Sequence, residues 1–172
     1  MPYGIFGGAS VFIDNHLYVA SGGCWNLTSR GYCFRDRLHR YDVVNSGPWE
    51  ELAPLIEQRR YAGAAPLPHL NDSFVVCGGR DEDGNGTLVT KRTCEAYNVV
   101  SNTWGPFAPL QVARSRFKLV GYKQYIYAIG GYDEGTFRSL DSIERWDAEM
   151  GRWTILSETL SYAVSTYAIV LM

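Results

Sequence analysis

The stretch Tyr125-Ile126-Tyr127-Ala128-Ile129-Gly130-Gly131-Tyr132-Asp133 decides the fold. It is a short apolar run that ends in two glycines, which is typical of a buried strand stopped where the backbone turns or passes close to a neighbour. The same punctuation ends Phe74-Val75-Val76-Cys77-Gly78-Gly79 and Tyr18-Val19-Ala20-Ser21-Gly22-Gly23, so the doublets recur at intervals of 56 and 52 residues. This recurrence indicates an internal repeat.

Two further landmarks follow each doublet at similar distances. An aromatic residue with an acid or amide after it lies 18, 18 and 15 residues beyond the second glycine, and a tryptophan lies 8, 7 and 7 residues beyond that aromatic. The aromatic residues are Tyr41, Tyr97 and Trp146, and the tryptophans are Trp49, Trp104 and Trp153. Landmarks that keep this order three times are not expected by chance.

With these landmarks the chain resembles the kelch repeat, whose unit of about 50 residues forms one four-stranded blade of a β-propeller. The resemblance implies an all-β fold in which residues 1–172 form a partial kelch propeller. We expect three four-stranded antiparallel blades at 9–55, 61–110 and 117–160, and an extra strand at 166–171 that is similar to the first strand of a fourth blade.

The expected strands follow from the apolar runs and the turn residues between them. In the first blade they are 9–13, 17–21, 38–43 and 49–52, with a long polar loop at 24–37. In the second they are 61–65, 73–77, 93–98 and 104–107, and in the third 117–121, 126–129, 142–146 and 153–156.

Blades radiate from an axis, so the gap between neighbouring sheets widens outward, and we expect the aromatic landmarks to fill it. A carboxylate stands two positions before the aromatic in two repeats, at Glu95 and Glu144, and is expected to bind backbone groups or an arginine. The first repeat has His39 there, which weakens that contact.

Three blades do not close a ring, because propellers use about four to eight. The end blades would then expose apolar surface, as in any uncapped repeat array. We interpret the chain as the carboxy-terminal half of a six-bladed propeller, and the alternative is that two copies pair. A third hypothesis is a fragment with no stable function of its own.

Composition gives limited information about the partner class, the cellular location and the state of the cysteines. The net charge of −2 argues against nucleic acid as the main partner, since phosphate binding usually leaves a basic excess. No signal peptide or membrane span is predicted, so we expect a cytoplasmic protein, with the nucleus as a second location. The four cysteines are expected to be reduced thiols, although a disulfide between Cys24 and Cys33 is an alternative.

No catalytic or metal constellation is predicted, and we expect neither an enzyme nor a cofactor. The histidines His16, His39 and His69 lack metal-ligand spacing, so the copper ligands of a kelch-fold oxidase are not supplied. The segment Asp81–Gly86 begins like a calcium-binding EF-hand loop, but its twelfth position is Arg92 rather than glutamate. We interpret it as an acidic turn.

Protein binding is the remaining class, because the loops carry arginine with tyrosine and tryptophan, which are frequent in interfaces. The last repeat resembles blades of kelch-like adaptors of cullin-based ubiquitin ligases, which implies that Tyr132 and Phe137 contact a substrate segment and that Arg60 and Arg116 hold acidic residues. Arg30 and Arg80 join them as loop candidates. The expected function is therefore substrate recognition for ubiquitin transfer, and the alternative is actin or cytoskeleton binding.

Overall fold

The structure is all β. The computed structural model describes residues 4–26 and 31–165, and for residues 25–26 and 31–35 we describe only the backbone. The strands pair in antiparallel fashion into three four-stranded sheets and two two-stranded ribbons.

The first sheet consists of β1 (Ala9–Ile13), β2 (His16–Asn26), β3 (Gly31–Asp42) and β4 (Glu50–Leu52). The second consists of β5 (Gly63–Pro66), β6 (Ser73–Cys77), β9 (Cys94–Asn98) and β10 (Thr103–Phe107). The third consists of β11 (Lys118–Tyr122), β12 (Tyr125–Ile129), β15 (Ser142–Asp147) and β16 (Arg152–Thr159). The ribbons are β7 (Arg80–Glu82) with β8 (Leu88–Thr90), and β13 (Tyr132–Asp133) with β14 (Arg138–Ser139).

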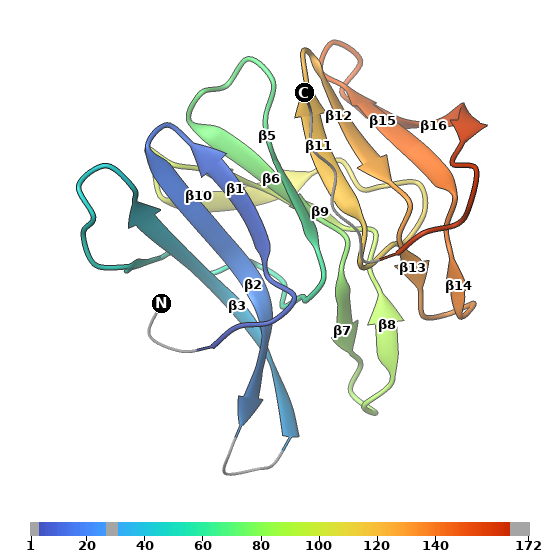
Figure 1. Ribbon diagram of the computed structural model, residues 1–172, viewed down its shortest axis with the longest axis horizontal. Helices are drawn as coiled ribbons and strands as arrows, with labels where there is room; N and C mark the ends of the chain where they lie inside the picture. The colour runs from blue at the N-terminus through green and yellow to red at the C-terminus, as the bar shows by residue number, and fades with distance from the viewer. Residues whose placement is uncertain (1–3, 27–30, 166–172) are drawn as a thin grey trace.

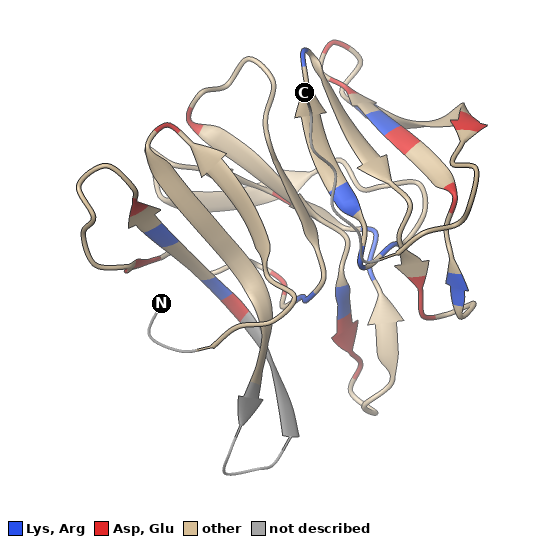
Figure 2. Cartoon of the chain, in the orientation of Figure 1, with Lys and Arg blue, Asp and Glu red and all other residues tan. Residues whose placement is uncertain are grey.

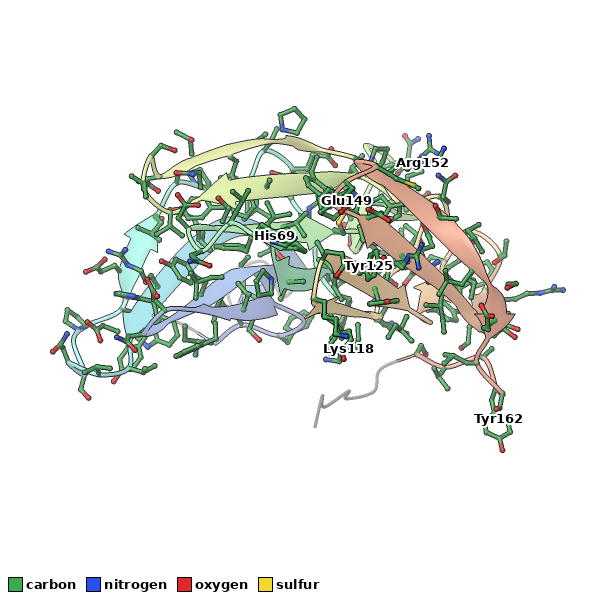
Figure 3. All side chains as sticks on the ribbon, turned by 90° about the horizontal axis from the view of Figure 1, so that it is seen from above. His69, Lys118, Tyr125, Glu149, Arg152 and Tyr162 are labelled. Carbon is green, nitrogen blue, oxygen red and sulfur yellow. A yellow bond between two sulfur atoms is a disulfide. The ribbon has the colours of Figure 1, made fainter. Side chains whose placement is uncertain are left out.

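The three sheets are successive blades of a fan. Seen from above, the outermost strands β4, β10 and β16 lie around the rim in cyan, yellow and orange-red (Figure 3). The first strands β1, β5 and β11 lie at the centre, where β5 contacts both β1 and β11. The two ribbons and the far ends of β2 and β3 all project to one side, which we call the ribbon face (Figure 1).

Each strand expected in the three blades overlaps a strand of the structure, and the predicted fold class is confirmed. The hairpin of β1 and β2 turns at Asp14-Asn15, with Asp14 at φ +49°, a backbone conformation that Asp and Asn adopt readily in two-residue turns. The polar loop predicted at 24–37 is wrong in part. Its two ends pair with each other as extensions of β2 and β3, after a register shift between Ala20 and Gly22.

Two residues with left-handed φ follow the second strand of the second and third blades, and the corresponding pair of the first blade lies within β2, at its register shift. In the second and third blades these are the expected glycine doublets. In the first blade they are Ser21 and Gly22, at φ +60° and +113°, so the equivalent pair lies one residue before the doublet Gly22-Gly23. Polar Ser21 adopts a conformation that is uncommon for residues other than glycine.

The second residue of each pair needs to be glycine because another segment passes close to it. Its N–H donates to the carbonyl oxygen of a residue that leads into the next blade, at Arg59, Arg114 and Val164 respectively. A Cβ atom at Gly79 or Gly131 would lie 2.8 Å from a backbone oxygen. The repeated glycine therefore marks the place where one blade is attached to its neighbour.

Two hydrophobic cores fill the two spaces between blades. The first lies between the first and second blades and contains Tyr18, Leu38, Phe74 and Tyr97, and the second lies between the second and third blades and contains Val75, Ile126, Trp146 and Trp153. The fourth-strand tryptophans tie these spaces together, since the indole N–H groups of Trp104 and Trp153 donate to the carbonyl oxygens of Ala53 and Ala108 in the preceding blade.

The aromatic landmarks of the first repeat are placed differently. Tyr41 and Trp49 pack their rings together at 5.2 Å, but both are only half-buried and neither belongs to the two cores. They lie on the side of the first blade that faces away from the second blade. They are therefore not wedges between two blades of the described chain.

A buried ion pair braces each of the other two blades. Arg59 and Glu95 form one pair and Arg114 and Glu144 the other, each at 2.6 Å with the arginine fully buried. Each arginine also donates to two carbonyl oxygens of its own blade. Each glutamate in addition accepts two backbone N–H groups of the segment that leads into the blade, which confirms the expectation that these carboxylates bind backbone and arginine.

The prediction of reduced thiols is contradicted. Cys77 and Cys94 form a disulfide, and Cys24 is also disulfide-bonded, with Cys33 as its backbone neighbour across β2 and β3. Cys77 and Cys94 stand directly opposite each other on the adjacent strands β6 and β9. The two cysteines are 17 residues apart in the sequence, and the ribbon β7–β8 lies between them along the chain. The sequence alone therefore does not indicate that they are close in space.

The blade limits predicted above stay a prediction, and the extra strand at 166–171 lies outside the described residues. Among the residues that the structure describes, no helix has the length and apolar character needed to cross a membrane.

Candidate partner-binding surface

Each blade presents two backbone-linked positions on the ribbon face. One lies just before the first strand and the other just after the left-handed pair, and an isolated antiparallel bridge joins them: Phe6 with Gly23, Arg60 with Arg80, and Ser115 with Tyr132. Because the three bridges are equivalent, the residues in them occupy the same place in successive blades.

The residue after each bridge has left-handed backbone geometry. These residues are Gly7, Tyr61 and Arg116, with φ of +63°, +57° and +51°. Tyr61 N–H donates to the carbonyl oxygen of Gly7 at 2.6 Å, and Arg116 N–H donates to that of Tyr61 at 2.9 Å. Left-handed φ is unfavourable for bulky residues, so these hydrogen bonds hold strained positions in place.

Arg60 and Arg116, which are both predicted to hold acidic residues, do not occupy equivalent positions in this ladder. Arg116 corresponds to Tyr61, whereas Arg60 corresponds to Ser115. The sequence signal that gives this alignment is the distance from the leucine that precedes each blade, because Tyr61 and Arg116 are both the sixth residue after Leu55 and Leu110.

Arginine and aromatic side chains alternate along the ladder, and we call this set the arginine–aromatic row. Its members are Phe6, Arg60, Tyr61, Arg80, Arg116 and Tyr132. The Arg60 guanidinium lies 5.8 Å from the ring centroids of both Phe6 and Tyr61, and that of Arg80 lies 5.0 Å from the Tyr61 centroid. The Arg116 guanidinium lies between two rings, at 5.1 Å from Tyr61 and 5.4 Å from Tyr132. In Figure 2, basic segments gather where the blades meet the ribbons.

The charge of Arg80 is already matched. Its guanidinium forms an ion pair with Glu134, a buried carboxylate on the turn of the neighbouring ribbon. Glu134 also accepts hydrogen bonds from the hydroxyl groups of Thr90 and Ser115. Arg80 therefore fixes the ribbon β7–β8 to the third blade, and its orientation over Tyr61 is set by this network.

Arg116 differs in that its charge has no acidic partner among the described residues. It is half-buried, and no carboxylate of the described residues lies within 4.0 Å of its guanidinium. The two tyrosine rings hold the guanidinium plane without using its hydrogen-bond donors. An anionic group of a ligand can therefore bind a preoriented, unmatched cation here.

A hollow of about 640 Å³ adjoins one end of the row. It is lined by Phe6, Arg60, Tyr61, Arg80 and residues of the ribbon β7–β8, namely Glu82, Gly86 and Leu88. Its volume falls within the range of about 300–1,000 Å³ that is usual for ligand pockets. Phe6, Tyr61 and Glu134 also contribute to this surface, although their sequence context does not predict it.

The other predicted site residues are dispersed. Phe137 lies at the tip of the ribbon β13–β14 and is 79% exposed, so it can contact a partner but does not belong to the row. Arg30 lies outside the described residues.

The acidic segment after Asp81 forms a turn that is closed by Asp83, whose carboxylate accepts the N–H groups of Asn85 and Thr87. Among the described residues, no group of His, Cys, Asp and Glu is arranged to hold a metal ion.

Comparisons with known proteins agree with this architecture. The family model of the Kelch motif matches residues 113–159, which cover the third blade. The solved structure of YjhT superposes with a TM-score of 0.77 over 95% of this chain and 54% of that chain, at 14% sequence identity. The chain is built from kelch repeats.

Several curated kelch proteins are similar in sequence. Kelch-like protein 40 of Xenopus laevis is 28% identical over 95% of this chain, and Kelch-like protein 23 of Homo sapiens is 25% identical over 91%. Kelch domain-containing protein 7A of Mus musculus is 33% identical over 69%. The chain spans about a quarter of the length of the two Kelch-like proteins, at 25% each, and 14% of the length of the third protein.

Proposed function

We propose that this kelch chain is a protein-binding module that holds an acidic segment of a partner along the arginine–aromatic row. The observation that carries the proposal is the Arg116 guanidinium, half-exposed between the rings of Tyr61 and Tyr132 and without an acidic partner among the described residues. Arg60 and the rim of the hollow extend the same surface toward the first blade.

The chemistry of the row favours a peptide-like segment over a small anion. The cations and rings alternate from the first blade to the third, so an extended chain can place carboxylates on arginines and its backbone or apolar groups on the rings. Arginine and tyrosine are also the residue types that most often carry binding energy in protein interfaces. Phe137, at the tip of its ribbon, adds an apolar contact on the same face.

Binding of matched peptides tests this proposal. We would measure fluorescence polarisation of a labelled peptide with two glutamates in a glycine–serine background, and of the same peptide with both glutamates replaced by glutamine. The glutamate peptide should bind more tightly, and its affinity should fall with added salt, because the charges are partly exposed. Equal affinity for both peptides would contradict an anion-binding row.

Arg116→Ala should weaken the glutamate peptide by about ten-fold or more, as expected for loss of a charged hydrogen bond. Arg116→Lys keeps the charge but loses the planar group between the two rings, so it should restore only part of the affinity. The matched control is Arg138→Ala, which removes the same charge from an exposed position on the ribbon β13–β14. A similar loss in both alanine variants would point to general electrostatics instead of this site.

We further propose that the bound partner is presented for ubiquitin transfer, as the resemblance to kelch-like adaptors implies. The named relatives of the same type support this finer function, among them the Kelch repeat and BTB domain-containing protein 2 of Ectromelia virus, 29% identical over 73% of this chain. In cells, a partner captured by the row should be degraded more slowly with Arg116→Ala than with Arg138→Ala. Unchanged partner lifetime, combined with row-dependent pelleting on actin filaments, would favour the cytoskeletal alternative.

A further inference from the structure

The blades of this chain join by one repeated contact. We call the side of a blade that packs on the next blade its leading face, and the opposite side its trailing face. The leading faces of the first and second blades supply Val11, Tyr18 and Leu38, and Ala65, Val75 and Cys77. The trailing faces of the second and third blades supply Phe74, Val76 and Tyr97, and Ile126, Ala128 and Trp146.

A directed hydrogen bond accompanies each contact. The tryptophan on the trailing side donates its indole N–H to the carbonyl oxygen two residues before the leucine that ends the preceding blade. Trp104 donates to Ala53, before Leu55, and Trp153 donates to Ala108, before Leu110. By the same count, Trp49 is the corresponding donor in the first blade, and the carbonyl of Glu158, before Leu160, is the corresponding acceptor in the third.

The two end blades retain the same surfaces without a described neighbour. The trailing face of the first blade carries Leu17, Val19, Tyr41 and Trp49, and the leading face of the third blade carries Val120, Tyr127 and Ile143. All seven side chains are half-buried, whereas their counterparts inside the two cores are nearly all buried. One end is thus built as the donor side of a blade contact and the other as its acceptor side.

We propose that this chain pairs head to tail with a second copy of itself. In this arrangement the leading face of the third blade of each copy packs on the trailing face of the first blade of the other. The contact is the one that the chain already makes twice internally, and its polarity allows two copies to close. The length of the chain is consistent with this pairing. One copy superposes on 54% of YjhT, so two copies supply about as many residues as that propeller.

The pairing also predicts a change at Gly131. In the chain alone, Gly131 N–H donates to the carbonyl oxygen of Val164, in the place that Arg59 and Arg114 occupy for the other two blades. By the equivalence of the bridges, this residue in the first blade is Ile5, directly before Phe6. The second copy's Ile5 would replace Val164 as the acceptor, so the segment after Leu160 competes with pairing.

Sedimentation velocity of the purified chain tests the proposal directly. The expected species at micromolar concentration has twice the chain mass of 19.3 kDa and dissociates on dilution. A variant that ends at Leu160 should dimerise at least as tightly, because Ile5 no longer competes with Val164. A folded monomer at all concentrations would overturn the proposal and leave the two faces to blades of a longer polypeptide.

Complementation between variants tests the head-to-tail geometry. Trp49→Glu alters only the trailing face and Tyr127→Glu only the leading face, so each variant alone carries a charge in both contacts of the pair and should be monomeric. An equimolar mixture forms one contact with both changes and one unaltered contact, and it should recover heterodimer. Recovery of the heterodimer identifies the head-to-tail arrangement. The arrangement is overturned if either variant dimerises alone or if the mixture forms no dimer.

Circular dichroism must show that each variant is folded. If either is not, the pair Leu17→Glu and Ile143→Glu replaces it on the same two faces and is read in the same way. The matched control is Val100→Glu, which introduces the same charge at a turn residue that is 81% exposed and lies on neither face. The control should dimerise like the unaltered chain.

Discussion

Neighbouring arginines of this chain have opposite roles. Arg59 and Arg114 are fully buried and brace the blades, whereas Arg116 presents its guanidinium to solvent between two rings. In the sequence these residues look alike, since all precede a first strand. The difference follows from register, because only the residue two positions after the bracing arginine reaches the left-handed position of the row.

Arg114→Ala should destabilise the fold by about 3–5 kcal/mol, because it leaves the fully buried Glu144 carboxylate without its ion-pair partner. Urea denaturation followed by tryptophan fluorescence measures this loss. Arg116→Ala serves as the comparison and should cost less than about 1 kcal/mol, as at a partly exposed site. Equal costs for the two variants would refute the division between bracing and presenting arginines.

His39 should make the stability depend on pH. Burial lowers the pKa of His39 below its usual value, and the positive charge of Arg37 adds to the effect, although the Glu51 carboxylate lies 4.0 Å away. A lowered folded-state pKa means that the unfolded chain binds more protons as the pH falls. The stability contribution of neutral His39 is therefore present above about pH 6.5, the unfolded value, and is lost as the pH falls through the folded pKa.

The free energy of unfolding should accordingly fall between pH 7.5 and pH 5 more steeply for the unaltered chain than for His39→Gln. Chemical denaturation at several pH values measures the difference. The same slope in both proteins would show that other groups cause the acid sensitivity.

At the scale of elements, most strands could be predicted from the sequence, because apolar runs and turn residues are local signals. The hairpin turn at Asp14 and the glycines at 78–79 and 130–131 fall in this class. The paired extensions of β2 and β3 could not, since the segment 24–37 is polar and lacks strand alternation. The disulfide of Cys77 and Cys94 depends on the register of two strands separated by a ribbon, which no local signal reports.

The candidate site could be predicted only in part, because it too depends on contacts between segments that are far apart in the sequence. The resemblance to kelch-like adaptors predicts Arg116 and Tyr132 as contact residues, whereas Tyr61 and Phe6 are not predicted, because their place in the row depends on a hydrogen-bond ladder between blades. Arg60 and Arg116 differ by one position within the repeat, so that Arg60 lies in a bridge whereas Arg116 has left-handed φ.

Gly131→Ala should destabilise the third blade by about 1–3 kcal/mol, because φ is +115° and the new Cβ would meet the Ser115 oxygen at 2.8 Å. Thermal unfolding measures the loss. Gly84→Ala, at a turn with open space around the glycine, is the matched control and should change stability by less than about 0.5 kcal/mol. A neutral Gly131→Ala would show that the attachment between blades tolerates displacement.

For the whole molecule, the middle blade is protected on both sides. Every residue of β6 is buried, since β6 lies between the two cores, whereas β4 is a three-residue strand on the rim with mostly exposed side chains. Opening of β6 requires disruption of both cores, while opening of β4 disturbs only the edge of the first core, against which Leu52 packs.

Amide hydrogen exchange should therefore be slowest in β6 and fastest, among the strands of the three sheets, in β4. Mass spectrometry of peptic fragments gives the order. Comparable protection of both strands at low protein concentration would mean that the blades open as one unit.

The bracing ion pairs also bear on how the chain is made. Arg59 precedes its partner Glu95 by 36 residues, and every group that its guanidinium binds lies between Glu57 and Glu95. A blade can therefore close around its arginine once its third strand has left the ribosome, before the following repeat is synthesised. The order of the repeats along the chain becomes an order of assembly in time, in which each finished blade offers a template surface to the next.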